Sequence, residues 1–311
     1  MPLPLCVVDA FTRDAFRGNP AAVCLPGPEA TSSWMQSVAA ELNLSETAFA
    51  IPLEPGRWRL RWFTPKAEVD LCGHATLATA HALWEAGDAP ALQPLCFETR
   101  SGPLHCCRED GLSETARIIM DFPAQPALAI PVPSGLEEAL GVPAVWVGRS
   151  REDLLVEVAS ASAVRGLKPN FSALAAFPVR GVLVTARSDR DDADFVSRFF
   201  APALGIDEDP VTGSAHCTLA CHWADRLGRT SLSGFQASAR GGTVGVELQG
   251  DRVRLLGHAV TAWRGGAWPS IAPPVCSRGS LNASDIYAPF FPCFIHAEIE
   301  NFSPRTKQSP R

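Results

Sequence analysis

The sequence predicts an α+β protein whose chain forms two similar halves. Its 311 residues are enough for two domains of ordinary size. Two segments, "EVDLCGHATLA" and "DEDPVTGSAHCTLA", each place an acidic residue ahead of a Gly, a polar residue, an Ala and an apolar helix. Strand-like runs precede this motif in both halves. A repeat at this separation indicates a duplicated domain rather than a solenoid.

The first half is predicted to begin with strands and a surface helix. Residues 3–11 and 58–65 read as strands, and in the second of them apolar and Arg side chains alternate. Between these strands, Thr31 or Ser32 can cap a helix that runs to about Leu42. The apolar face of that helix consists of Trp34, Met35, Val38, Ala39 and Leu42.

A helix at residues 73–86 is rich in Ala and Leu and carries almost no charge. A helix that is apolar nearly all round belongs inside a domain, surrounded by strands. The second half repeats this plan, with a similar helix beginning at Gly213. The strand-like runs ahead of that helix are residues 142–148, 153–159 and 179–186.

A segment with four Pro residues between the halves is the natural linker. We therefore predict an N-terminal domain at 1–122, a linker at 123–135 and a C-terminal domain at 136–266. The last strand of the second domain can return to the first. Residues 267–311 have Pro clusters and no clear period, so we predict an irregular tail.

Charge and hydropathy exclude several partners. The net charge is -6 and no basic block is present, so we expect no nucleic-acid partner. No stretch reaches the roughly 18 apolar residues of a membrane helix, and the N-terminus lacks the basic region of a secretory signal. We therefore expect a cytoplasmic protein with a small-molecule partner.

The ten cysteines are scattered and are interpreted as reduced thiols. No C-x-x-C pair occurs, and Cys217 and Cys221 are better explained as packing residues of a buried helix than as zinc ligands. No Walker or G-x-G-x-x-G motif occurs in the context that nucleotides require. We accordingly expect neither a metal nor a cofactor.

The two apolar helices each begin with a Gly followed by a polar residue. Helix N-termini carry free backbone N–H groups and bind anions. If the halves face each other, the N–H groups of Gly73–Ala75 and Gly213–Ala215 converge on one cleft, where a carboxylate and its developing enolate could be held. The alternative is that each Gly only permits close packing.

Four motifs together resemble the PhzF family, the phenazine biosynthesis-like proteins. They are "DAFTRDAFRGNPAAVCLP", "NLSETAF", "RWFTPKAEVDLCGHATLATAHAL" and "DPVTGSAHCTLA", and the match covers roughly residues 3–266. The resemblance implies a diaminopimelate epimerase-like fold. In that fold two pseudo-symmetric domains each wrap a mostly antiparallel sheet around a central helix, with the active site between them.

The resemblance also implies an isomerase in which Glu46 shuttles a proton, assisted by His74, Asp209 and Ser214. Asn19 and Arg240 are further candidates for contacts with a small anionic substrate. We expect partial burial to raise the pKa of Glu46, so that it can exchange a proton near neutral pH. A homodimer is a further expectation.

Each assignment has a structural alternative. Glu46 could be a solvated loop carboxylate, His74 a core or capping residue, and Asp209 a helix cap. A non-enzymatic interaction protein with the same fold is the alternative function. A two-cysteine racemase is disfavoured because Cys72 is matched in the second half by Thr212, whose hydroxyl is too weak an acid to replace a thiolate.

Overall fold

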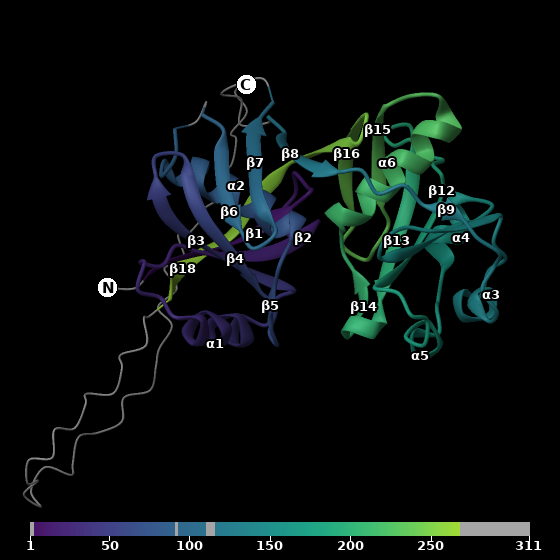
Figure 1. Ribbon diagram of the computed structural model, residues 1–311, viewed down its shortest axis with the longest axis horizontal. Coiled ribbons are helices and arrows are strands. Elements are labelled where there is room, and N and C mark those ends of the chain that lie inside the picture. Colours follow the sequence, from purple (N-terminus) through teal and green to yellow (C-terminus); the bar gives the residue numbers. More distant parts are fainter. Residues whose placement is uncertain (1–2, 91–92, 110–115, 268–311) are drawn as a thin grey trace, which may run out of the picture. The chain divides into compact units, whose positions relative to one another are not determined.

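The computed structural model describes residues 3–90, 93–109 and 116–267, and its strands fall into two groups (Figure 1). The N-terminal half contains β1 Leu3–Ala10, β2 Asn19–Cys24, β3 Glu46–Glu54, β4 Arg57–Phe63, β5 Glu68–Val69, β6 Leu95–Thr99, β7 Gly102–Arg108, β8 Ile118–Pro123 and, from the end of the described chain, β18 Ala259–Ala267. The C-terminal half contains β9 Leu128–Ala129, β10 Trp146–Arg149, β11 Asp153–Glu157, β12 Gly181–Arg187, β13 Phe195–Ala201, β14 Ile206–Asp209, β15 Ser231–Gln236, β16 Gly242–Gln249 and β17 Arg252–Gly257.

Both halves use the same pattern of strand pairing. The first runs β18-β1-β2-β3-β4-β6-β7-β8, with β2–β3 and β4–β6 parallel and the other neighbours antiparallel. The second runs β9-β10-β11-β12-β13-β15-β16-β17, with β11–β12 and β13–β15 parallel and the others antiparallel. The α+β prediction is confirmed, and the repeated pattern supports an internal duplication.

The halves are connected by backbone hydrogen bonds as well as by the chain. Strand β8 pairs with β7 on one side and with β17 on the other, so the ladder continues from one half into the next. Strand β18 follows β17 in the chain but pairs with β1. Residues of the N-terminal half are therefore contributed by both ends of the described chain.

Each half contains one central helix, α2 Gly73–Ala86 or α6 Gly213–Leu227. Helix α2 has ten buried residues and no charged residue before Glu85, which explains why strands can surround it. Gly87 and Gly228 end the two helices in the left-handed region, at φ +76° and +64°. Side chains from both helices belong to one continuous apolar core.

Helix α1 Ser32–Leu42 begins and ends where its capping residues predict. The Thr31 hydroxyl accepts from the Trp34 N–H at 3.2 Å, and Asn43 ends the helix at φ +51°. Met35 and Ala39 are fully buried against Phe49 and Phe63. Three residues separate the end of α1 from β3, whose first residue is Glu46.

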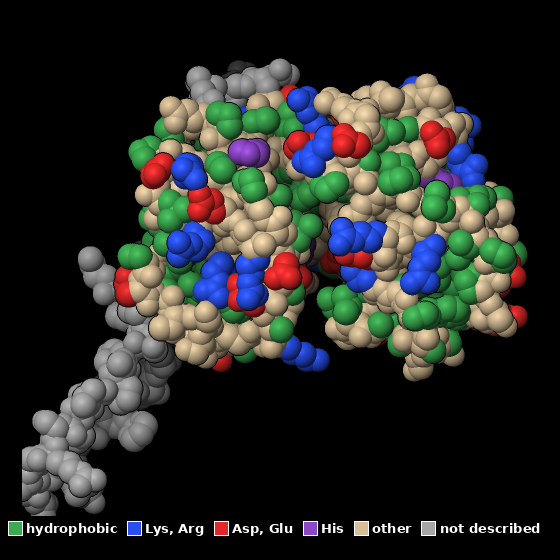
Figure 2. Space-filling model, viewed as in Figure 1, with side chains coloured by type: hydrophobic (Ala, Val, Ile, Leu, Met, Phe, Trp, Pro, Cys, Tyr) green, Lys and Arg blue, Asp and Glu red, His purple; other side chains and the backbone are tan. Residues whose placement is uncertain are grey.

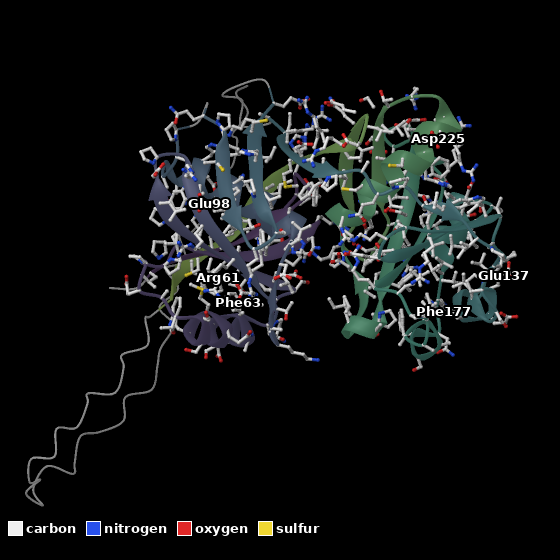
Figure 3. All side chains as sticks on the ribbon, in the orientation of Figure 1. Arg61, Phe63, Glu98, Glu137, Phe177 and Asp225 are labelled. Carbon is white, nitrogen blue, oxygen red and sulfur yellow. The ribbon has the colours of Figure 1, made fainter. Side chains whose placement is uncertain are left out.

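Arg61 of β4 holds α1 and β5 to the sheet. Its guanidinium lies 5.0 Å from the centre of the Phe63 ring, as Figure 3 lets the reader follow. It also donates to both carboxylate oxygens of Glu68, at 2.7 and 2.8 Å, and to the Ser32 hydroxyl at 2.9 Å. The alternation of apolar and Arg side chains in this strand thus separates a core face from a hydrogen-bonding face.

Short helices cover the C-terminal half. They are α3 Leu136–Leu140, α4 Ala161–Gly166, α5 Phe171–Leu174 and the 3₁₀ turn Pro202–Leu204. Helices α4 and α5 lie between β11 and β12 in the chain, the place that α1 occupies between β2 and β3. They pack on a second core formed with β10 to β13.

The predicted boundaries differ from the structure in two details. The predicted linker 123–135 contains Pro123 of β8 and the short strand β9, and Ala267, the first residue of the predicted tail, is the last residue of β18. The rest of the predicted tail lies outside the described residues. Because residues 1–268 belong to one compact unit, the division into two domains stays a prediction.

No helix in the described part of the chain has the length and apolar character that a membrane span requires.

Candidate active site

The N-termini of α2 and α6 meet where the two halves face each other. A Cβ atom added to Gly73 would lie 3.6 Å from the Cα atom of Gly213, so the two backbones are almost in contact. Ala75 and Ala215, in the same first turns, are fully buried. The first-turn N–H groups of a helix have no carbonyl partner within it, and here two such groups lie together. The close approach of the two helix N-termini is what the predicted anion site requires.

Glu46 and His74 are in contact beside this junction. The Glu46 Oε2 atom lies 3.3 Å from the His74 Nε2 atom, and both side chains are largely buried. Burial raises the pKa of Glu46 to about 7, with a further contribution from the charge of Asp209. Burial lowers the pKa of His74 to about 3, so the imidazole is neutral and the contact is a hydrogen bond rather than an ion pair.

Asn19, the first residue of β2, joins His74 to Asp209. Its Nδ2 atom lies 3.2 Å from the His74 Nδ1 atom and donates to the Asp209 Oδ1 atom and the Val211 carbonyl, both at 2.8 Å. An Nδ2 atom can only donate, which assigns the proton of neutral His74 to Nε2. His74 then donates that proton to Glu46.

Asp209 is the last residue of β14, and its carboxylate accepts hydrogen bonds from Asn19 and Thr212. The Thr212 hydroxyl donates to its Oδ2 atom at 2.5 Å. Burial raises the pKa of Asp209 to about 6, against the lowering effect of the hydrogen bonds from Thr212 and Asn19. The carboxylate is therefore mostly ionised at neutral pH, and its negative charge faces Glu46.

Gln236 of β15 fixes the backbone that carries Asp209. Its Oε1 atom accepts from the Thr212 N–H at 2.9 Å, and its Nε2 atom donates to the Asp209 carbonyl at 2.7 Å. Gln236 is fully buried. The sequence offered no signal for it, because a lone Gln in a strand belongs to no motif.

Arg240 contacts the segment that precedes Asn19. Its guanidinium donates to Asp9 at 2.7 Å and to the carbonyls of Arg17 and Gly18 at 2.9 and 2.8 Å. Asp9 also accepts from the Phe16 N–H at 2.6 Å. These contacts hold the loop that leads into Asn19, so they favour a supporting role for Arg240 over the expected contact with substrate.

Ser214 and Cys72 complete the junction. Ser214 is half-buried, and its hydroxyl makes no hydrogen bond to any described residue, which leaves it available to a ligand. Cys72 lies directly before α2, and its Sγ atom is 3.6 Å from the His74 Nδ1 atom. Burial raises the pKa of the Cys72 thiol, which therefore stays protonated at neutral pH. Thr212 holds the matching place before α6.

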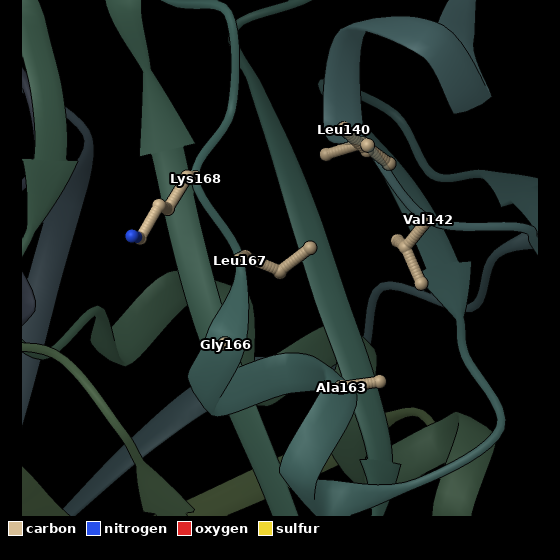
Figure 4. A pocket seen from close by; sticks show the side chains of 7 residues that line it. Leu140, Val142, Ala163, Gly166, Leu167 and Lys168 are labelled. Atoms are coloured by element: carbon tan, nitrogen blue, oxygen red, sulfur yellow. The ribbon is translucent and has the colours of Figure 1, made fainter.

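The surface is hollowed between the two halves, with basic and acidic side chains on both sides (Figure 2). A separate hollow of about 310 Å³ lies among α3, α4 and the segment after α4. Its lining is mostly aliphatic, and Lys168 points away from Leu140 and Val142 (Figure 4). This second hollow offers no carboxylate or imidazole, so it lacks the acid–base chemistry of the junction.

Comparison with known proteins agrees with the fold. The family described as phenazine biosynthesis-like protein, PhzC-PhzF, matches residues 8–265. The chain belongs to this family. The resemblance to the PhzF proteins is thereby confirmed.

Several bacterial relatives of this PhzF-family chain are named isomerases. An uncharacterized isomerase of Pseudomonas aeruginosa is 52% identical over 260 residues, which cover 84% of this chain and 96% of that protein. An uncharacterized isomerase of Halalkalibacterium halodurans is 49% identical over 265 residues, covering 85% and 98%. A crystal structure of an Enterococcus faecalis PhzF-family protein superimposes with a TM-score of 0.81 at 41% identity, covering 86% of this chain and 100% of that one. The chain is an isomerase of the PhzF type.

Proposed function

We propose that this protein moves a proton between two carbons of a small carboxylate, with Glu46 as the single acid–base group and without a cofactor. The observation that carries the proposal is the position of Glu46, whose pKa is raised to about 7 beside two helix N-termini. A general base works best when its pKa lies near the operating pH. An anion held at the helix N-termini would place its neighbouring carbon close to this carboxylate.

The reaction follows from the groups at the junction. Ionised Glu46 removes a proton from a carbon next to the substrate carboxylate, so that a C–H bond breaks and an O–H bond forms. The electron pair moves into the substrate carboxylate as an enolate, which the N–H groups of Gly73–Ala75 and Gly213–Ala215 stabilise. Glu46 then returns the proton, on the same face, to the far carbon of a C=C bond that adjoins the first carbon. A C–H bond forms there, and the double bond moves to the position next to the carboxylate as the enolate electrons return.

His74, Asp209 and Ser214 have distinct parts in this proposal. The Nε2–H group of His74 donates to the ionised form of Glu46 and orients it. The charge of Asp209 raises the pKa of Glu46, which makes its ionised form a stronger base. The free hydroxyl of Ser214 is a donor for the substrate. Asn19 holds His74 and Asp209 in one network.

The test is proton exchange at carbon in deuterium oxide. A panel of small unsaturated and amino carboxylates is incubated with the protein, and mass spectrometry follows deuterium uptake. Glu46→Gln keeps the size of the side chain but cannot carry a proton, so we expect the rate to fall by roughly 10²-fold or more. Glu41→Gln, on the exposed face of α1, is the matched control and should exchange at the wild-type rate.

An exchange rate for Glu46→Gln close to that of the wild type would reject the assignment of Glu46.

A further inference from the structure

Three side chains that commonly bind metals converge at the start of α2. They are Glu46, Cys72 and His74, and one ligand atom from each lies within 4.8 Å of the other two. The Glu46 Oε2 and His74 Nε2 atoms are 3.3 Å apart, and the Cys72 Sγ and His74 Nε2 atoms are 4.0 Å apart. In residues 3–90, 93–109 and 116–267 no other group of three His, Cys, Asp or Glu side chains comes this close.

These distances suit a tetrahedral ion. Zn²⁺ binds nitrogen at about 2.0–2.1 Å, oxygen at about 2.0–2.2 Å and thiolate sulfur at about 2.3 Å. Two ligands at a tetrahedral angle are then roughly 3.3–3.7 Å apart. The Glu46 and His74 atoms already have this spacing. The Cys72 Sγ atom lies 4.0 Å from His74 Nε2 and within 4.8 Å of the Glu46 ligand atom, so it must move closer to both, by rotation of the Cys72 side chain.

The charges around this group of residues favour a divalent cation that is bound by anionic side chains of the protein. The N-terminus of α2 disfavours a bare cation but stabilises a thiolate, and the thiol of Cys72 already faces the Ala75 N–H group. The Cys72 thiolate and the Glu46 carboxylate together balance the charge of a divalent ion. Asp209, whose charge reaches Glu46, adds negative potential.

We propose that Glu46, Cys72 and His74 form a binding site for a thiophilic divalent cation of the Zn²⁺ or Cd²⁺ class. On binding, the S–H bond of Cys72 breaks, an S–metal bond forms and the proton leaves to solvent. His74 binds through Nε2, so its own proton moves to Nδ1, beside Asn19. The Asn19 Oδ1 atom is buried and has no partner among the described residues. Turning the amide would bring Oδ1 to the Nδ1–H group of His74, at the expense of the Nδ2 hydrogen bonds to Asp209 and to the Val211 carbonyl.

The bound ion would occupy the oxygen that Glu46 uses as a base. The site therefore acts as an inhibitory site, a consequence that rests on the proposed function. The binding itself does not depend on it. Because Cys72 releases a proton when the ion binds, affinity should rise with pH.

Titration of the reduced full-length protein with CdCl₂, in the absence of substrate, tests the site. Absorption from thiolate-to-cadmium charge transfer reports the Cys72 bond, and calorimetry reports stoichiometry and affinity. We expect one Cd²⁺ per chain at this site, with binding weakened by at least about tenfold, or ~1.4 kcal/mol, in Cys72→Ser. Glu46→Gln should also weaken binding. Cys221→Ser, which changes a thiol in α6 outside the group, should bind as the wild type does.

Equal charge-transfer absorption and affinity in the wild type and in folded Cys72→Ser would overturn the proposal, because the ion would then be bound by other thiols. Circular dichroism establishes whether Cys72→Ser is folded. If it is not folded, Glu46→Gln decides, and wild-type affinity in that variant overturns the proposal. Since substrate is absent, this outcome is separate from any failure of the isomerase proposal.

Discussion

At the scale of single residues, the site contains two partly buried carboxylates whose pKa values are both raised. Glu46 and Asp209 ionise in the folded protein at pH values of about 7 and 6, above their ordinary values of 4.5 and 3.8. Their ionisation therefore costs more free energy in the folded chain than in the unfolded one. The raised pKa that would suit Glu46 for the proposed proton transfer therefore lowers the stability of the folded chain near neutral pH.

This cost gives a prediction that needs no substrate. A raised folded-state pKa contributes stability that is fully present below the unfolded pKa and is lost as pH rises through the folded pKa. For Glu46 that window runs from about pH 4.5 to 7. Glu46→Gln removes the loss, so relative to the wild type its free energy of unfolding should rise by roughly 3 kcal/mol between pH 4 and pH 8.

Urea unfolding at several pH values measures this difference. The raised pKa of Asp209 also lowers the free energy of unfolding as pH rises, and it does so in both the wild type and Glu46→Gln. The difference between these two proteins therefore reports on Glu46. Glu41→Gln, with its exposed side chain, should show no such change with pH. A constant difference between Glu46→Gln and wild type across this range would mean that Glu46 is solvated, as the structural alternative holds.

At the scale of elements, the two central helices were predictable and the strand pairing was not. Residues 73–86 and a helix from Gly213 could be assigned because a Gly, a polar residue and an uncharged apolar run are all local features. The parallel pairs β2–β3 and β4–β6 depend on which distant strands meet, which no local pattern records. The repeated motif indicated two similar halves, and the strand pairing adds that both halves connect their strands in the same order and direction.

The same distinction applies to the candidate site. Glu46, His74 and Asp209 lie in motifs and could be named, and the structure brings them into one network through Asn19. Gln236 contacts Asp209, and Arg240 contacts Asp9. Both contacts join residues that are distant in the sequence, so neither contact could be predicted from local motifs. Cys72 was recognised from the sequence, but only as a thiol whose counterpart in the second half is Thr212.

Substitutions at Gly213, at the start of α6, test why this position lacks a side chain. The reason is either the approach of a ligand to the backbone or the close packing of the helix. A Cβ atom there would meet Leu255, Gly73 and Phe11 at 3.5–3.7 Å, which are ordinary contacts. Gly213→Ala should therefore change stability by less than about 1 kcal/mol. If the ligand approaches this backbone, Ala should weaken carboxylate binding by about tenfold, and Gly213→Val by more.

The matched control lies at the other end of the same helix. Gly228 has φ +64° and open space around its Cα atom, so Gly228→Ala should lower stability through backbone strain and leave binding unchanged. Calorimetric titration with a carboxylate and thermal unfolding measure the two properties separately. Unchanged affinity in Gly213→Val together with a large loss of stability would show that Gly213 serves packing alone.

At the scale of the whole molecule, two similar halves share strands in a way that should make them unfold together. Strand β8 pairs across to β17, and β18 returns from the C-terminal half to pair with β1. One apolar core contains side chains from both α2 and α6. Unfolding of one half would expose core surface and break the ladder of the other, which favours a single transition.

Trp223 of α6 provides the test of this coupling. It is 2% exposed, stacks on Phe195 at 5.9 Å and donates to the Thr185 hydroxyl at 3.0 Å, all within the C-terminal half. Trp223→Ala should cost about 3–5 kcal/mol through the cavity it leaves. The buried residues Trp58 and Trp62 remain in the variant and report by fluorescence on the N-terminal half.

If the halves are coupled, the fluorescence of the remaining tryptophans and the far-ultraviolet circular dichroism of Trp223→Ala should change at one shared urea concentration, lower than that of the wild type. The shared strands then make the active-site junction as stable as the whole chain, because neither half can open its own helix N-terminus alone. Two separate transitions, with the N-terminal tryptophans unfolding at the wild-type midpoint, would instead show that the predicted domains fold independently. The β8–β17 pairing would in that case only orient the two halves around Glu46.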